Sequence, residues 1–139
     1  MSEQKLREYL TSNVDSRGHF SPIEAHASQP GIPDYAYTVE GVNGWLELKW
    51  GTPKKPPELR LMQQVWLRRN VKHDGNALIF CGIQVEEVRT FGLIHANRYK
   101  RVYLTKGCDP WLKAMNVSWP GKVDWAEFLE ILKQPESLR

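Results

Sequence analysis

The chain has 139 residues, of which 41% are hydrophobic and six are tryptophan, and its net charge is +3. This length fits one domain with a substantial core, spanning 1–139. The hydrophobic content excludes a disordered chain. Because no run of about 18 apolar residues occurs, we expect no membrane span and no membrane partner.

The start of the sequence and its two cysteines bear on where the protein works. Met1 to Glu8 has no apolar stretch of the kind that a secretion signal needs. Cys81 and Cys108 are far apart and unpatterned, so we expect two reduced thiols and neither a disulfide nor a zinc site. These observations predict a cytoplasmic protein.

The first third of the chain predicts one helix and a β-hairpin. The hydrophobic residues of 3–12 have helical spacing. Residues 19–25 fit a short edge strand, because their proline is tolerated only at an edge or a strand start. Residues 34–40 alternate and are rich in aromatic and β-branched side chains. We therefore expect a strand there, followed by a turn at 41–44 and a return strand at 45–50.

The rest of the chain predicts helices and strands in a mixed order. Residues 57–70 have helical spacing, with a proline suited to the first turn. The further elements that we expect are a strand at 77–81, strands at 90–94 and 101–104, a short helix at 110–115 capped by Asp109, and a helix at 123–133. This order predicts a mixed α/β (α+β) fold, in which helices flank a central mixed β-sheet.

Two short strings on the expected hairpin carry the chemistry. Pro33-Asp34 begins its first strand, and Glu47 and Lys49 lie two residues apart on one face of its second. Mg²⁺ prefers oxygen ligands, so Asp34, Glu47 and the backbone carbonyl of Leu48 form a candidate metal site. Lys49 is placed to orient a water molecule or to stabilise charge on a phosphate. The pattern predicts metal-dependent cleavage of a phosphodiester.

The register of this hairpin decides whether the two carboxylates meet. A loop at 41–44 places Asp34 opposite Gly51, which is too far from Glu47 to share an ion. A bulge, a longer loop or an inward curl of the strand start must then bring Asp34 back.

Basic residues gather after the return strand. From Lys49 to His73 there are seven Lys or Arg residues and one acidic residue. Positive charge beside carboxylates suits an anionic polymer, so we expect DNA as the partner. The candidate contacts to DNA phosphates are Lys54, Lys55, Arg68 and Arg69. A solvated helix face and loop explain each of these equally well, and the tryptophans at 111, 119 and 125 favour core packing over stacking on bases.

The motif resembles the PD-(D/E)XK nuclease superfamily, in particular its virus-type replication-repair nuclease branch and small phage relatives. The residues that carry the resemblance are Gly31-Ile32-Pro33-Asp34, Gly44-Trp45-Leu46-Glu47-Leu48-Lys49 and a following helix with Gln63 and Trp66. The resemblance covers about Glu24 to Cys81. It implies a restriction-endonuclease-like core and a Mg²⁺-dependent endonuclease in which Mn²⁺ substitutes, without an organic cofactor. It implies Asp34 and Glu47 as metal ligands and Lys49 as the catalytic lysine.

The resemblance also implies an upstream acidic residue and a glutamine on the helix after the lysine strand. Glu24, ten residues before Asp34, is the best match for the acid and joins the expected catalytic and metal-binding residues. Gln63 is the best match for the glutamine, with Gln64 as its competitor. The rotation of the helix decides between these two.

The leading hypothesis is a structure-selective or weakly sequence-selective DNA endonuclease, for which branched DNA such as a Holliday junction is a natural substrate. If the protein is phage-encoded, we expect it in the cytoplasm of the host. A small chain gains reach by forming a homodimer, because a two-fold dimer places two sites on two strands. One alternative is a non-catalytic nucleic-acid-binding protein that keeps the nuclease fold. Another is a small phage-encoded inhibitor of a host factor, in which the motif is fortuitous.

Overall fold

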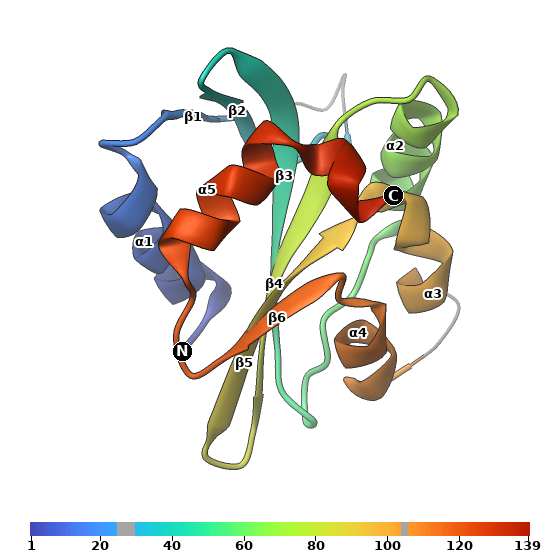
Figure 1. Ribbon diagram of the computed structural model, residues 1–139. Helices are drawn as coiled ribbons and strands as arrows, with labels where there is room; N and C mark the ends of the chain where they lie inside the picture. Colours follow the sequence, from blue (N-terminus) through green and yellow to red (C-terminus); the bar gives the residue numbers. More distant parts are fainter. Residues whose placement is uncertain (25–29, 104–105) are drawn as a thin grey trace.

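The structure, a computed structural model, describes residues 1–24, 30–103 and 106–139. A six-stranded sheet in the order β1-β2-β3-β4-β5-β6 passes through the molecule, and helices cover both of its faces (Figure 1). Its strands are β1 (His19–Pro22), β2 (Tyr35–Val39), β3 (Val42–Gly51), β4 (Ala77–Val85), β5 (Val88–His95) and β6 (Val117–Pro120). The pair β3/β4 is parallel and the other neighbours are antiparallel. The predicted mixed sheet between helices is confirmed.

The helices are α1 (Glu3–Val14), α2 (Leu61–Lys72), α3 (Tyr99–Tyr103), α4 (Asp109–Ala114) and α5 (Trp125–Lys133), with the 3-10 helices η1 (Ala96–Arg98) and η2 (Pro135–Leu138). The longest of them have 12 residues. Within the described ranges, no helix is both long and apolar enough to cross a membrane.

The turn between β2 and β3 is shorter than predicted. Val39 pairs with Val42, so the loop consists of Glu40 and Gly41 alone, whose φ angles are 47° and 82°. Two positive φ angles are typical of the type I′ turns that close two-residue hairpins. The predicted turn at 41–44 is wrong because Gly44 lies inside β3, where the ring of Tyr37 covers it so closely that a Cβ atom would lie 2.4 Å away.

The helix after β3 begins later than predicted, at Leu61 and not near Pro57. Pro57 packs directly on Gly51, where a Cβ atom would lie 2.1 Å from the proline ring, and this contact holds the chain in a loop. The chain is still extended at Arg60, with φ −69° and ψ 158°. The helix then connects the parallel strands β3 and β4, as a parallel pair requires.

Two further predictions differ from the structure. The strand expected at 101–104 is wrong, because Tyr99–Tyr103 is a helix in which the rings of Tyr99 and Tyr103 stack one turn apart. Leu104 and Ala25, which ended two expected strands, lie outside the described residues.

The second difference lies in the short helix α4, because Asp109 is its first residue and not its cap. In addition, strand β6 was not predicted.

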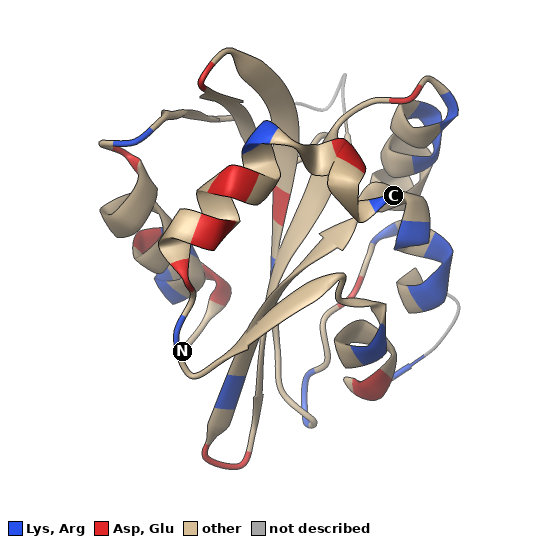
Figure 2. Ribbon diagram, in the orientation of Figure 1, with Lys and Arg blue, Asp and Glu red and all other residues tan. Residues whose placement is uncertain are grey.

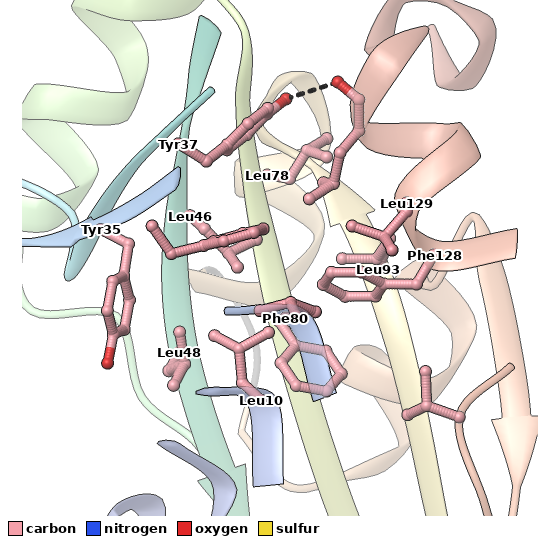
Figure 3. Packing of buried hydrophobic residues seen from close by; sticks show 14 of the residues in the cluster. Leu10, Tyr35, Tyr37, Leu46, Leu48, Leu78, Phe80, Leu93, Phe128 and Leu129 are labelled. Carbon is pink, nitrogen blue, oxygen red and sulfur yellow. Dashed lines mark hydrogen bonds between the residues drawn. The ribbon is translucent and has the colours of Figure 1, made fainter. Parts of the chain in front are cut away.

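The two faces of the sheet carry separate cores. Under α1 and α5, aromatic and aliphatic side chains pack together, and the Tyr37 hydroxyl donates a hydrogen bond to the Leu132 carbonyl at 3.1 Å (Figure 3). Under α2, α3 and α4 lies a second cluster that contains both cysteines, which are free and buried. Trp111 and Trp119 are buried and Trp125 packs on the first core, so the prediction of core packing for these three is confirmed.

Candidate active site

The short β2–β3 turn brings the two predicted carboxylates together. Tyr35 pairs with Leu46, and the same antiparallel register carried one residue further places Asp34 opposite Glu47. Strand β2 ends there, while β3 continues to Gly51. Beyond the end of β2, the Leu48 N–H of β3 donates its hydrogen bond to the Oδ2 atom of the Asp34 side chain, at 2.8 Å, instead of to a backbone carbonyl of β2.

The Leu48 carbonyl points to the same edge of β3. In an antiparallel pair a residue exchanges both its N–H and its C=O with the residue opposite, so both groups lie on one side of the strand. The next residue of the register opposite Leu48 is Pro33, which has no N–H to donate. Two carboxylates and one carbonyl therefore lie at this edge, and such a set of hard oxygen donors fits Mg²⁺.

Glu47 and Lys49 are both buried, with 3% and 6% of their surface exposed. The Lys49 ammonium lies 3.8 Å from the Glu47 carboxylate. Gln63 of α2 bridges the two, because its Nε2 donates to Glu47 at 2.5 Å and its Oε1 accepts from Lys49 at 3.0 Å. The same Oε1 accepts from the Arg60 N–H at 3.0 Å, so the bridge also fixes the first turn of α2.

The choice between the two glutamines follows from the rotation of α2. Gln63 faces the sheet, whereas the Gln64 side chain turns back and donates to the Leu59 carbonyl at 2.8 Å. Gln63 is therefore the glutamine that joins the group.

Glu47 carries an unusual proton affinity. Its pKa is raised to about 9, chiefly by burial and also by hydrogen bonding and charge repulsion from the neighbouring Asp34. The positive charge of Lys49 acts in the opposite direction, and the negative charge of Glu3 adds to the rise. A cation between the two carboxylates would relieve this repulsion, since an opposite charge favours the ionised form.

Helix α1 contributes two residues that the sequence analysis missed. Arg7 lies with Nη2 at 3.5 Å from the Asp34 carboxylate, and its guanidinium stands 5.3 Å from the ring centre of Tyr35. Glu3, one helical turn before Arg7, is close enough to affect the pKa of Glu47. Their only signal in the sequence is an acid and a base four residues apart, which is typical of a surface ion pair.

Glu24 lies near the group but is not part of it. The Ile23 N–H donates to the Asp34 carbonyl at 2.8 Å, so the chain passes beside the site, yet the Glu24 side chain is exposed. In the ranges that the structure describes, no three His, Cys, Asp or Glu side chains come together in a way that could hold a metal. The candidate site therefore contains two carboxylates, those of Asp34 and Glu47, and the Glu24 side chain is not a third.

The four candidate DNA contacts are all exposed. Lys54 and Lys55 lie in the loop after β3, and Arg68 and Arg69 lie on the second half of α2. Helices α2 and α3 contain basic and no acidic residues, whereas α5 carries two glutamates and one lysine (Figure 2). An anionic ligand is therefore favoured on the side of α2 and α3.

No family model, curated protein or solved structure matches this chain. The group of Asp34, Glu47, Lys49 and Gln63 is therefore the feature on which a function can be proposed.

Proposed function

We propose that this protein is a divalent-metal-dependent DNA endonuclease of the PD-(D/E)XK type. The observation that carries the proposal is that Glu47 and Lys49 lie buried side by side on β3, with Asp34 opposite them. Burying ionisable groups costs free energy that their mutual attraction does not always recover. A group of this kind with a strongly shifted pKa, at the open edge of a strand, favours catalysis over a structural role.

Each residue of the group has a role that fits its chemistry. Asp34, Glu47 and the Leu48 carbonyl would hold Mg²⁺, or Mn²⁺ in its place. An ion held there would act as a Lewis acid and would lower the pKa of a coordinated water. Gln63 fixes the position of the Lys49 ammonium, and Lys49 stabilises the negative charge that develops on the phosphoryl oxygens during hydrolysis.

The basic residues around α2 support DNA as the substrate. Lys54, Lys55, Arg68 and Arg69 are exposed and free to approach phosphates on either side of the cleaved bond. We extend the proposal to branched DNA cut by a homodimer, because two sites related by a two-fold axis suit two strands. A phage enzyme acting in the host cytoplasm fits this proposal.

The test is cleavage of labelled DNA as linear duplex, single strand and four-way junction, in Mg²⁺, in Mn²⁺ and in EDTA. We expect the wild-type protein to cut with either metal and not in EDTA. Lys49→Ala should cut at least about 100-fold more slowly, as expected for the loss of one preorganised electrostatic group. The preferred substrate then defines the structural selectivity.

A matched control separates the role of Lys49 from a general loss of positive charge. Lys122 is an exposed lysine in the turn between β6 and α5, and Lys122→Ala should leave the rate unchanged. Salt-sensitive DNA binding without cleavage in either metal would contradict the proposal in favour of a non-catalytic nucleic-acid-binding protein. Neither binding nor cleavage would favour the inhibitor hypothesis.

A further inference from the structure

A groove of about 770 Å³ lies beside the candidate active site. It is lined by residues of β3, of α2 and of the segment before β2, which include Ile32, Trp45, Met62, Trp66, Arg69 and Asn70. Trp45 precedes Glu47 by two residues on the same face of β3, a distance of about 7 Å along a strand. In the same way, Ile32 precedes Asp34 by two residues and Met62 precedes Gln63 by one, so the groove has neighbours of the site in its lining although no candidate catalytic residue lines it.

One wall of the groove is aromatic. The rings of Trp45 and Trp66 meet edge to face, with their centres 5.2 Å apart and an angle of 71° between their planes. Both side chains are half-buried, so part of each ring borders the groove. The volume is in the range of sites that take a small organic group. A flat aromatic group such as a nucleobase stacks well on indole, and it does so with little dependence on the base.

The polar residues of the groove fit the rest of a nucleotide. Arg69 is an exposed guanidinium at the rim, on a helix without acidic residues, and suits a phosphate. Asn70 also lines the groove, and its buried Oδ1 atom has no hydrogen-bond partner among the described residues. Buried acceptors without a partner are uncommon, and an N–H donated by a bound base would satisfy this atom.

We propose that this groove binds an unpaired nucleotide of the DNA next to the cleaved phosphate. The base stacks on Trp45 and Trp66, and the phosphate of the nucleotide lies against Arg69. This inference rests on the proposed endonuclease function and names the substrate class: DNA with unpaired bases at a branch, a tail or a gap. An intact duplex fills the groove only if a base leaves the stack, which costs free energy.

The test is the affinity for two fluorescently labelled DNAs, a blunt duplex and the same duplex with a single-stranded tail, measured in EDTA so that no cleavage occurs. The wild-type protein should prefer the tailed DNA. Trp66→Leu keeps an apolar side chain but removes the aromatic face, so its affinity for the tailed DNA should fall at least about fivefold. Its affinity for the blunt duplex should stay as in the wild type. Equal affinity of the wild type for both DNAs would overturn the inference.

Arg69 and Arg68 provide a matched pair, since they are adjacent, exposed and on one helix, and only Arg69 lines the groove. Arg69→Gln should reduce affinity for the tailed DNA more than for the blunt duplex. Arg68→Gln should reduce both equally, as expected for contacts to the DNA backbone alone. The inference is overturned if the two variants behave alike.

A crosslinking experiment uses the wild-type protein and so does not depend on how a variant folds. Iododeoxyuridine in the single-stranded tail should crosslink to Trp45 or Trp66, as mapped by mass spectrometry. Crosslinks confined to other residues would overturn the inference. Metal-dependent cleavage without a preference for the tailed DNA would refute nucleotide binding in the groove and leave the endonuclease function standing. A preference for the tailed DNA with crosslinks in the groove, but without metal-dependent cleavage, would refute the endonuclease function alone.

Discussion

The two faces of the sheet differ in what they bury. Under α1 and α5, the rings of Phe80, Phe91 and Phe128 pack with neighbouring tryptophans and aliphatic side chains. Figure 3 shows Phe80 and Phe128 among the leucines of this core. Under α2, the sheet buries Glu47 and Lys49 beside aliphatic residues. Apolar burial stabilises a fold, whereas buried charges often do not. The first face therefore supplies stability, and the second carries the buried charged groups on which the proposed function depends.

The helices that cover the two faces of the sheet also differ in charge. Helix α2 carries Arg68, Arg69 and Lys72, while α5 carries Glu127 and Glu130 (Figure 2). A polyanion is therefore attracted more strongly to the first surface than to the second. The buried charges and the basic surface thus lie on one side of the molecule, and the comparison predicts that mutations on the two sides have different consequences.

The largest expected effect is on the apolar face. Phe128 is fully buried and its ring contacts those of Phe80, Trp119 and Trp125. Phe128→Ala should lower the free energy of unfolding by about 3–5 kcal/mol, measured by urea denaturation. The exposed Met62→Ala on α2 should change it by less than about 0.5 kcal/mol. Similar losses in both variants would contradict the assignment of the core.

The second expected effect is an increase in the free energy of unfolding, caused by a substitution at Glu47. Folding raises the pKa of Glu47 from 4.5 to about 9, so the folded protein holds this proton more tightly than the unfolded chain. This tighter proton binding stabilises the folded protein fully when the pH is below the pKa that Glu47 has in the unfolded chain. The stabilisation is lost as the pH rises toward the pKa that Glu47 has in the folded protein. Glu47→Gln should therefore raise the free energy of unfolding near pH 8, by a few kcal/mol, since a tenfold change in proton affinity corresponds to about 1.4 kcal/mol.

The control for this effect is Glu58→Gln, which changes an exposed glutamate in the loop before α2. Its stability should follow that of the wild type at every pH. The measurement is thermal denaturation without metal across mildly acidic to mildly basic buffers. The raised pKa of Glu47 would be contradicted if the stability of the wild type does not fall with rising pH. It would also be contradicted if the stability of Glu47→Gln depends on pH in the same way as that of the wild type.

The smallest expected effect compares the two neighbouring glutamines. Gln63→Leu removes the bridge that positions Lys49 and Glu47, and misplacing a catalytic group costs about 10- to 100-fold in rate. Gln64→Leu removes a hydrogen bond to the Leu59 carbonyl only and should keep the rate. The readout is the cleavage rate at saturating DNA. Equal rates for the two variants would exclude a positioning role for Gln63.

Much of the sheet was predictable because alternation along a strand fixes its faces. Leu46 and Leu48 face the core under α1 and α5, and Glu47 and Lys49 face α2, as the sequence pattern predicts. The register was not predictable from the turn residues. The strongest local turn signal is Asn43-Gly44, but the packing of the Tyr37 ring over Gly44 places the turn at Glu40-Gly41.

The limits of the site prediction have a similar cause. Asp34, Glu47, Lys49 and Gln63 could be identified because they lie close in sequence on adjacent elements. Arg7 could not, since it precedes Asp34 by 27 residues and their contact depends on how α1 packs against the sheet. The helix at Tyr99–Tyr103 was missed because its five residues are too few to display the spacing that distinguishes a helix from a strand.

The most direct test of the central claim is calorimetric titration of Mn²⁺ into the wild-type protein and into Asp34→Asn. The asparagine keeps an oxygen that can accept the Leu48 N–H, so the fold should persist while one ligand charge is lost. We predict saturable binding by the wild type and a loss of most of that affinity in the variant. Equal Mn²⁺ binding by both proteins, or none by the wild type, would contradict a metal site at Asp34 and Glu47.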